Sequence, residues 1–271
     1  MKAKKSLGQN FLICPWVVDE IIEGAELSLG DTVLEIGPGT GVLTRPLAAH
    51  AKKVIAVEKD EYLAEKLRTA LAREKMKNVE IITGDAISLF QTKSRISRLS
   101  LESEKYKIVA NIPYYLTSHL LRLVLEHGPR PCLAVLTIQK EVAERITARP
   151  PDMSILGLSV QVFCTPRIIK TVPASCFFPK PKVDSAIIKL SDISDNFFTK
   201  NKIKPDLFFK IIRSAFGQKR KILANSLASI AGDKKTALEI LHATKINQSS
   251  RPEELTLNEW TALCRAVFPV S

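Results

Sequence analysis

Residues 33–41 of this 271-residue chain have the sequence Val-Leu-Glu-Ile-Gly-Pro-Gly-Thr-Gly and constrain its fold more than any other stretch. A short apolar run leads into a glycine-rich turn, and apolar residues at helical spacing follow. This succession forms the nucleotide-binding unit of α/β folds. A dinucleotide-binding turn has its third glycine where Val42 stands, so the spacing favours a nucleoside close to the backbone of Gly37 and Gly39. A plain tight turn between a strand and a helix is the alternative.

Strands and helices alternate along much of the chain. Apolar periodicity predicts strands at 32–36, 53–57, 79–83, 106–110 and 133–138, and helices at 42–50, 60–74, 117–127 and 139–146. Another helix begins near Pro15, and two later strands, 158–164 and 183–190, are expected to form a hairpin. The alternation predicts an α/β fold with a Rossmann-like, mostly parallel sheet and helices on both faces.

Polar side chains fall at the carboxyl ends of these strands, which is the edge where open α/β sheets bind ligands. Glu58 ends the second strand, about 20 residues after Gly37, where an acidic side chain accepts hydrogen bonds from ribose hydroxyls. Asp85 follows the third strand and can accept from the exocyclic amine of an adenine. The alternatives are a solvated carboxylate for Glu58 and a helix N-cap for Asp85. Their convergence on one edge favours a nucleoside site.

The tetrapeptide Asn111-Ile112-Pro113-Tyr114 follows the strand at 106–110. An exocyclic base amine is a poor nucleophile, because its lone pair is delocalised into the ring. The Asn111 oxygen and a backbone carbonyl held rigid by Pro113 can each accept one N–H bond and favour a pyramidal nitrogen. Tyr114 offers a face on which an extruded base can stack. The tetrapeptide therefore suits alkylation of a base amine, and an ordinary turn after a strand is the alternative.

A stiff loop further along the chain combines aromatic and basic residues. Phe177 and Phe178 precede two prolines and the cations Lys180 and Lys182. Aromatic rings beside cations are how proteins hold unstacked nucleotides. One of the two phenylalanines is expected in the core and the other at the functional surface. A hydrophobic plug under the loop is the alternative.

The net charge of the chain indicates the kind of partner, and the loss of strand–helix alternation divides the chain into two parts. The formal net charge of +12 favours a polyanionic partner. Residues 1–190 are expected to form the α/β domain, 191–204 a linker and 205–271 an all-helical domain, because a polar stretch interrupts the alternation and helical periodicity follows it. Three consecutive cations, Lys219, Arg220 and Lys221, lie in the helical part.

Several classes of protein are disfavoured by what the chain lacks. There is no apolar run of about 18 residues and no apolar segment of a secretory signal, so a cytoplasmic location is expected. Five cysteines are odd in number and widely spaced, without a Cys-x-x-Cys pair, which argues against a zinc site and a disulfide framework. Reduced, mostly buried cysteines are expected. The four histidines show no metal-ligand spacing, and no metal is expected.

Seven motifs occur in a specific order, and an eighth stretch extends the pattern into the helical part. They are Gly8–Leu12, Glu35–Gly41, Glu58, Gly84–Ala86, Asn111–Tyr114, Gln139–Arg145 and Phe177–Ser185, followed by Phe216–Lys221. In this order they resemble the ribosomal RNA adenine N6,N6-dimethyltransferase family, most closely its bacterial small-subunit members. The resemblance covers nearly the whole chain.

The resemblance implies a class I methyltransferase that dimethylates adenine amines in small-subunit ribosomal RNA during subunit biogenesis. It implies S-adenosylmethionine as the methyl donor, with contacts at Asn10, Leu12, Gly37, Gly39, Glu58, Asp85 and Asn111. Asn111, Pro113 and Tyr114 would hold the target adenine, with Phe178 or Phe177 on its other face. The partner would be RNA within an immature ribosomal subunit, bound by a monomer through Lys180, Lys182, Lys219, Arg220 and Lys221.

Three other interpretations share part of the pattern. A large-subunit rRNA methylase of the resistance type has the same cofactor motifs but is disfavoured by Phe216–Lys221. A non-catalytic RNA-binding assembly or transcription factor on a methylase scaffold need not keep Gly37, Glu58, Asp85 and Asn111 together. A dinucleotide oxidoreductase is disfavoured by Val42 and by the aromatic and basic loop.

Overall fold

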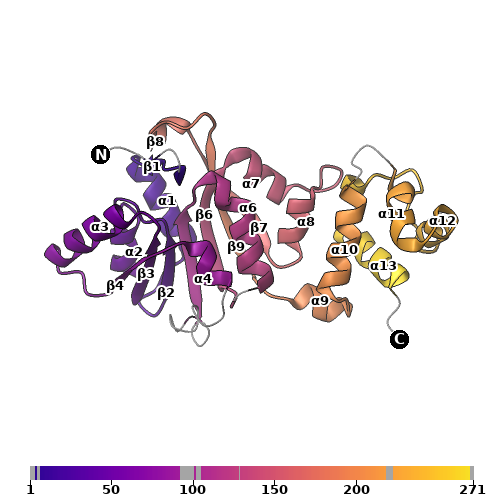
Figure 1. Ribbon diagram of the computed structural model, residues 1–271, viewed down its shortest axis with the longest axis horizontal. Coiled ribbons are helices and arrows are strands. Elements are labelled where there is room, and N and C mark those ends of the chain that lie inside the picture. Colours follow the sequence, from indigo (N-terminus) through magenta and orange to yellow (C-terminus); the bar gives the residue numbers. More distant parts are fainter. Residues whose placement is uncertain are drawn as a thin grey trace. The chain divides into compact units, whose positions relative to one another are not determined.

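The computed structural model describes Lys4 and residues 7–91, 101, 105–127, 129–217 and 222–268. One of its compact units is built on a seven-stranded sheet with the order β4-β3-β2-β5-β6-β9-β7 (Figure 1). Neighbouring strands from β4 to β6 are parallel, whereas β9 runs antiparallel to both β6 and β7. The predicted mostly parallel α/β sheet is confirmed. The strands are β2 (Thr32–Ile36), β3 (Lys53–Glu58), β4 (Val79–Thr83), β5 (Tyr106–Asn111), β6 (Leu133–Gln139), β7 (Thr165–Val172) and β9 (Ser185–Ser191).

The central strands are mostly apolar because both faces of the sheet are covered. All five residues of β2 are buried, as are the first five of β5. Helices lie on both sides of the sheet (Figure 1). They are α1 (Pro15–Ala25), α2 (Thr44–His50), α3 (Glu61–Arg73), α4 (Ala86–Gln91) and α6 (Thr117–Arg122), which continues as the π-helical turn η3 (Leu123–His127).

The strand register brings the polar strand ends together. In the paired strands Ile36 lies beside Val57, Glu58 beside Thr83, and Asn111 beside Thr137. Because the strands from β4 to β6 are parallel, these residues share one edge of the sheet. The predicted strands that end at 36, 57, 83, 110 and 138 are all present, so the edge is the one that the sequence indicated.

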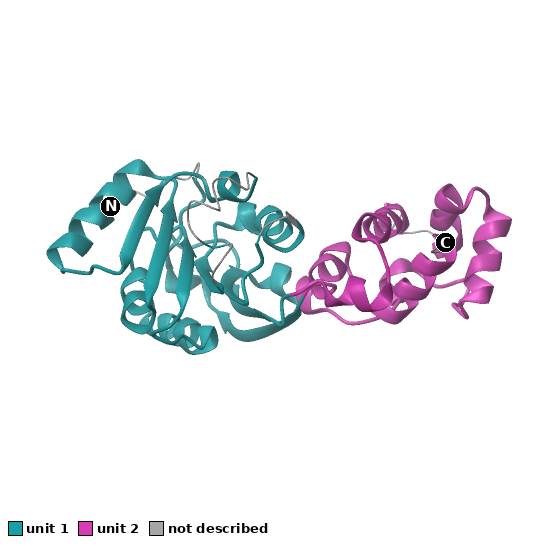
Figure 2. Cartoon of the chain, turned by 90° about the horizontal axis from the view of Figure 1, so that it is seen from below, with its two compact units in different colours: residues 1–144, 164–193 teal, residues 145–163, 194–271 magenta. Residues whose placement is uncertain are grey.

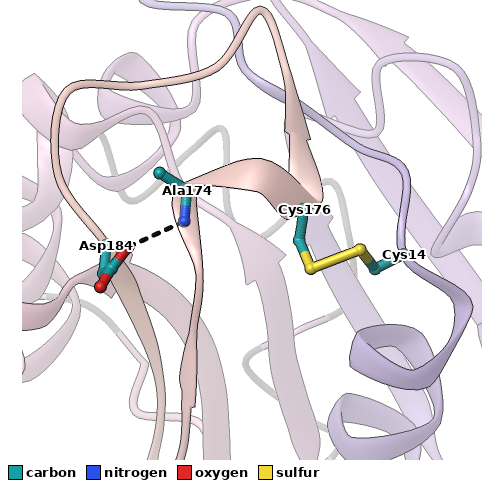
Figure 3. The surroundings of a disulfide bond; sticks show 4 residues. All are labelled: Cys14, Ala174, Cys176 and Asp184. Carbon is teal, nitrogen blue, oxygen red and sulfur yellow. Dashed lines mark hydrogen bonds between the residues drawn. A yellow bond between two sulfur atoms is a disulfide. The ribbon is translucent and has the colours of Figure 1, made fainter.

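A two-stranded antiparallel sheet joins the N-terminal segment to the aromatic and basic loop. β1 (Phe11–Leu12) pairs with β8 (Phe177–Phe178), with Phe11 opposite Phe178 and Leu12 opposite Phe177. β8 follows the 3₁₀ turn η4 (Ala174–Cys176), where the Asp184 carboxylate accepts a hydrogen bond from the Ala174 N–H at 2.9 Å (Figure 3).

The expectation of five reduced cysteines is wrong. Cys14 and Cys176 form a disulfide with their Cα atoms 5.1 Å apart, and it links the residue before α1 to the residue before β8 (Figure 3). The sequence hides this pair because 162 positions separate the two residues, and only the pairing of β1 with β8 brings them together. Cys132, Cys164 and Cys264 form no disulfide within the described residues, and the last two are buried as expected.

A second expectation about local structure is also wrong. Residues 158–164 were predicted to form a strand paired with 183–190, but 155–161 form helix α8 (Ile155–Gln161), capped by the Ser154 side chain. The antiparallel partners of β9 are instead β6 and β7, and the sequence prediction missed β7. Short apolar runs do not distinguish a buried strand from a buried helix, and here the Ser154 cap decides for the helix.

The described chain divides into two compact units, residues 1–144 with 164–193 and residues 145–163 with 194–271 (Figure 2). The chain enters the second unit within α7 (Lys140–Thr147), returns after α8, and enters it again at 194. The expected linker at 191–204 contains a helix, α9 (Asn196–Asn201). Further helices of this unit are α10 (Pro205–Phe216), α11 (Leu223–Ala231), α12 (Lys234–Ala243), the turn η5 (Pro252–Glu254) and α13 (Leu257–Val267).

The second unit has its own core and its own helix caps. Trp260 is fully buried and stacks on Phe216, and Phe163, Phe198, Phe208 and Phe209 form an aromatic cluster. Asp233 caps α12, and Thr256 forms a capping box with Glu259 at α13. No described helix is both long and apolar enough to cross a membrane.

Candidate active site

A cleft of about 940 Å³ opens at the carboxyl edge of the parallel strands. Residues 7–12 of the N-terminal segment form one wall, and the loops after β2, β3, β4 and β5 form the rest. The structure brings together nine residues that the sequence singled out for cofactor or target base: Asn10, Leu12, Gly37, Gly39, Glu58, Asp85, Asn111, Pro113 and Tyr114. Phe178 does not line this cleft.

The glycine-rich turn has backbone angles and spacing that only small residues accept. Gly37 and Gly39 have φ angles of 69° and 57°, in the left-handed region that L side chains rarely adopt. A Cβ atom on Gly39 would lie 3.2 Å from the ring of Phe11. The turn therefore lets the N-terminal segment pack directly against its backbone, and the Gly37 N–H is fixed by the Val57 carbonyl at 2.9 Å.

Glu58 is 6% exposed and its carboxylate is already held by backbone donors. Its Oε2 accepts from the Gly39 N–H at 3.0 Å and its Oε1 from the Asp60 N–H at 2.8 Å. A carboxylate has lone pairs for about four hydrogen bonds, so capacity remains on the side that faces the cleft. The two backbone bonds fix the orientation in which Glu58 can meet a ligand hydroxyl, and the solvated alternative does not fit this burial.

Glu35, the acidic residue of β2, lines the same cleft and is more buried than Glu58. It is 1% exposed, and its Oε2 atom has no hydrogen-bond partner among the described residues. Burial raises the pKa of Glu35 from 4.5 to about 8; the nearby Thr44 hydroxyl opposes the shift and the charge of Glu58 adds to it. Glu35 is therefore largely protonated at neutral pH. In the motif Glu35–Gly41 the sequence pattern predicted a role for the glycines, and it predicted no separate role for Glu35.

Asp85 makes the helix-capping contact that was the alternative prediction, and its role toward an adenine amine stays a prediction. Its Oδ1 accepts from the Ile87 N–H at 2.9 Å, as a cap of α4 does, and its Oδ2 pairs with Lys59 Nζ at 2.8 Å. Partial burial acts to raise the pKa of Asp85, but the hydrogen bonds from Lys59 and Ile87 outweigh it and lower the pKa. Asp85 is thus an anionic acceptor at the rim of the cleft, in addition to its capping contact.

The side chain of Asn111 is oriented by the N-terminal segment. Its Nδ2 donates to the backbone carbonyl of Asn10 at 3.0 Å, and the Asn10 side chain in turn donates to the Gly8 carbonyl at 3.2 Å. Because the amide nitrogen is engaged, the Asn111 oxygen remains as the group that can accept a bond within the cleft. The Asn10 carbonyl is a contact that the sequence could not reveal, since 101 positions separate the two residues.

The two carbonyls beside the Pro113 ring differ in their hydrogen bonds. The Pro113 carbonyl accepts from the Leu116 N–H at 2.9 Å, and the Ile112 N–H donates to Thr137 at 3.1 Å. No donor within the described residues contacts the Ile112 carbonyl. Of the two carbonyls beside the proline ring, that of Ile112 is therefore the one available to a ligand.

Tyr114 is fixed at its hydroxyl. The hydroxyl lies 2.7 Å from Ser185 Oγ at the start of β9, and Ser185 is fully buried. Burial raises the pKa of Tyr114, so the phenol stays neutral. Sequence reasoning assigned Tyr114 its ring face and missed Ser185, whose place beside Tyr114 depends on the antiparallel pairing of β9 with β6.

The two phenylalanines of β8 have different environments. Phe177 is 2% exposed and belongs to the core under the sheet, whereas Phe178 is 58% exposed. The prediction that one of the two rings is core is confirmed by Phe177, and the functional role predicted for the other ring stays a prediction. Lys180 and Lys182 are exposed in the loop after β8. Lys219, Arg220 and Lys221 lie outside the described residues.

One further contact closes the N-terminal wall. The Asp60 carboxylate accepts from Gln9 Nε2 at 3.2 Å and pairs with Lys4 Nζ at 3.0 Å. Burial acts to raise the pKa of Asp60, and the bonds from Lys4 and Gln9 lower it on balance. Asp60 thereby holds the segment that presents Asn10 to Asn111. Among the described residues no group of three or more His, Cys, Asp and Glu could hold a metal ion.

Comparison with known proteins agrees with this geometry. The profile of the family described as ribosomal RNA adenine dimethylase matches residues 1–266. Ribosomal RNA small subunit methyltransferase A of Dehalococcoides mccartyi is 41% identical, over 97% of this chain and 88% of its own length. The crystal structure of a dimethyladenosine transferase from Plasmodium falciparum superposes with a TM-score of 0.78 at 31% identity, covering 93% of this chain and 95% of its own. That of the 23S rRNA methyltransferase ErmE superposes with a TM-score of 0.74 at 25% identity, covering 95% and 99%.

The cleft also suits the cofactor of this family, S-adenosylmethionine. It has a glycine turn without side chains and buried carboxyl oxygens at Glu35 and Glu58. The chain therefore belongs to the ribosomal RNA adenine dimethylase family and is an S-adenosylmethionine-dependent methyltransferase that acts on rRNA adenine.

Proposed function

We propose that this protein dimethylates the exocyclic amine of adenine in small-subunit ribosomal RNA, and that its substrate is an immature small ribosomal subunit. The observation that carries the proposal is the hydrogen bond from Asn111 Nδ2 to the Asn10 carbonyl, because it leaves the amide oxygen free to accept from a base amine. The small-subunit substrate is supported by the name of the Dehalococcoides relative.

The proposed chemistry needs positioning more than acid–base groups. S-adenosylmethionine supplies a methyl group on a sulfonium, which is already a strong electrophile. The Asn111 oxygen and the Ile112 carbonyl accept the two N–H bonds of the amine, and acceptors off the base plane favour a pyramidal nitrogen. The lone pair then points out of the ring, and preorganised acceptors of this kind act mainly in the transition state. The alkylated nitrogen carries positive charge and releases its proton to water.

Tyr114 is proposed to hold the target base by stacking, with its ring fixed through Ser185. A ring held at its hydroxyl loses less freedom when a base stacks on it, so more of the stacking energy appears as affinity. Two methyl groups on one nitrogen require that the monomethylated base binds again. After the first transfer only one N–H remains, so one acceptor suffices for the second step.

In the cofactor half of the cleft, Glu58 is proposed to accept from the ribose hydroxyls of S-adenosylmethionine and Asp85 from its adenine amine. Gly37, Gly39, Asn10 and Leu12 are proposed to contact the cofactor through their backbone or by close packing. Each assignment is supported by the position of the residue in the cleft.

RNA binding is proposed to involve the helical unit and the loop after β8. The chain has a formal net charge of +12, and Lys180 and Lys182 are exposed. Phosphate contacts supply most of the affinity of proteins for nucleic acids and make it depend on salt. We propose that Lys219, Arg220 and Lys221 contribute to this surface, that residues 1–190 and 205–271 are the catalytic and RNA-binding parts, and that the protein acts as a monomer. A ribosomal substrate implies a cytoplasmic location.

Methyl transfer to defined substrates tests the proposal. The protein is incubated with cofactor labelled in its methyl group and with immature small subunits, mature small subunits, or naked large-subunit rRNA. The expected result is label in immature small subunits, as dimethyladenosine at a defined position. The similarity to the 23S rRNA methyltransferase ErmE makes large-subunit rRNA the second candidate substrate, and label found only there would replace the proposal with that function.

A further inference from the structure

A second hollow lies beside the cleft and has no role in the proposed reaction. It is a groove of about 1,140 Å³ between β1, the start of α1, the glycine-rich turn and β8. Three large apolar side chains stand exposed in it: Ile13 at 58%, Phe178 at 58% and Val42 at 37%. Exposed apolar side chains gathered in a groove indicate a binding surface.

The groove is continuous with the cleft. Phe11, Leu12, Thr40 and Val42 line both hollows, so one wall separates them. Phe11 packs on the Gly39 backbone on one side and pairs with Phe178 on the other. Asn10, the residue before Phe11, is the one that orients Asn111. A base seated at Asn111 would therefore have its neighbour in the RNA chain at the mouth of this groove.

The chemistry of the lining suits a nucleobase better than a phosphate. The lining contains the aromatic ring of Phe178 and aliphatic side chains that include Ile13 and Val42. An aromatic ring stacks on any base, because every base has a π-face. The carboxylate of Asp19 also lines the groove, which disfavours phosphate and can accept from a base amine. The cations Lys180 and Lys182 lie instead in the loop directly after Phe178, where the sugar-phosphate backbone would pass.

We propose that this groove binds the nucleobase adjacent to the target adenine, with Phe178 stacking on that neighbouring base rather than on the target. The inference rests on the proposed function and deepens it. It changes the role of Phe178, because Phe178 lines the groove and not the cleft that contains Tyr114. The target adenine then lies in the cleft and the neighbouring base lies in the groove, so the two bases are not stacked on each other.

Photocrosslinking tests where the groove lies on the RNA. A benzophenone side chain is introduced at position 13, since Ile13 lines the groove but not the cleft. The matched control is position 29, where Leu29 is 77% exposed and lines neither hollow. Each protein is irradiated with immature small subunits, and the crosslinked nucleotide is mapped by primer extension. The expected crosslink from position 13 is within one or two nucleotides of the methylated adenine, with none there from position 29.

Kinetics supply the second readout. Phe178→Ala is expected to raise the KM for immature small subunits roughly 5- to 100-fold, the range that loss of one base-stacking ring gives. Ile13→Ala should raise KM by about 3-fold, and Leu29→Ala should not change it. Cofactor affinity should stay at the wild-type value in all three variants.

The possible outcomes distinguish a failure of the groove proposal from a failure of the proposed function. If wild-type protein methylates the subunits, but position 13 crosslinks only to distant nucleotides or Phe178→Ala has wild-type KM, the groove proposal is overturned and the function stands. If Phe178→Ala lowers kcat as Asn111→Ala does, Phe178 acts on the target base instead. If wild-type protein does not methylate small subunits at all, both proposals fall.

Discussion

The two halves of the cleft are built in different ways. The cofactor half consists of the turns after β2, β3 and β4, which are adjacent parallel strands, and Glu58 accepts a hydrogen bond from the glycine turn next to it. The target half depends on segments that are remote in sequence: Asn10 orients Asn111, and Ser185 fixes Tyr114. The difference indicates that the cofactor half is rigid by virtue of the sheet, whereas the target half is rigid only while the N-terminal segment stays in place. Substitutions in the two halves should therefore affect different measured quantities.

The largest effect is expected for Asn111→Ala. Removal of one preorganised polar group from a reacting centre lowers turnover by about 10²–10³-fold. The single-turnover rate of methyl transfer to immature small subunits should fall by that factor, while RNA affinity changes little. Some loss of cofactor affinity is also expected, since Asn111 lines the cleft that receives the cofactor. A variant that loses RNA affinity and keeps its rate would assign Asn111 to binding.

Removal of the Cys14–Cys176 disulfide should mainly destabilise the target half. The bond closes a loop of 162 positions, and the chain-entropy relation gives about 5 kcal/mol for such a loop, with measured values more often at 2–4 kcal/mol. Cys176→Ser should lower the unfolding free energy by that order in urea titrations without reductant. In excess dithiothreitol the two proteins should be about equally stable. An equal difference with and without reductant would mean that the bond is absent in solution.

Glu58→Ala tests the cofactor half. Its loss should leave donors of the bound nucleoside and the Gly39 N–H without their acceptor, and should weaken cofactor binding by about 1–3 kcal/mol. At saturating cofactor the single-turnover rate should return close to the wild-type value. Calorimetry gives the affinity, and unchanged affinity would remove Glu58 from the cofactor site.

Tyr114 and Ser185 form a pair that can be tested by a double-mutant cycle. Tyr114→Phe and Ser185→Ala each remove one side of the same hydrogen bond, so each should lower the methylation rate only a few-fold, and the double variant should be no worse than either. Tyr114→Ala should lose about 1–3 kcal/mol of base stacking. Additive effects of the two conservative changes would show that the bond does not orient the ring.

A further prediction concerns the dependence of stability on pH. Burial raises the pKa of Glu35 from 4.5 to about 8, so between these values the folded protein keeps a proton that the unfolded chain releases. Stability contributed by this proton is fully present below pH 4.5 and is lost as pH rises to about 8. Glu35→Gln should flatten this decline. The midpoint of thermal unfolding from pH 5 to 9 measures it, and parallel pH profiles for the two proteins would contradict the assignment.

The same contrast explains what could be predicted from sequence. The strands that end at Ile36, Glu58 and Asn111 were predictable, because parallel strands buried on both faces are continuous apolar runs and the polar residues follow them directly. The glycine turn was predictable because its spacing is local. The cofactor half of the candidate site could thus be assembled from motifs.

The rest of the fold and of the candidate site depends on contacts between distant segments, which no local sequence pattern indicates. The Cys14–Cys176 bond requires the β1–β8 pairing, and the Tyr114–Ser185 contact requires the β6–β9 pairing. The contact of Asn111 with the Asn10 carbonyl likewise joins segments 101 positions apart. Helix α8 was predicted as a strand, since an apolar run at 158–164 fits either structure and the cap at Ser154 was overlooked. The exposure of Phe178 and the burial of Phe177 follow from pairing with β1, which leaves only one of two neighbouring rings in the core.

The most direct test of the account combines product analysis with binding for one variant from each half. Wild-type, Asn111→Ala and Glu58→Ala proteins react in single turnover with immature small subunits at saturating cofactor, and the digested RNA is analysed for N6,N6-dimethyladenosine. We expect dimethyladenosine at a defined site from wild type and from Glu58→Ala, and a rate about 10²–10³-fold lower from Asn111→Ala with RNA still bound. Dimethyladenosine formed by Asn111→Ala at the wild-type rate would contradict the claim that this amide oxygen activates the base amine.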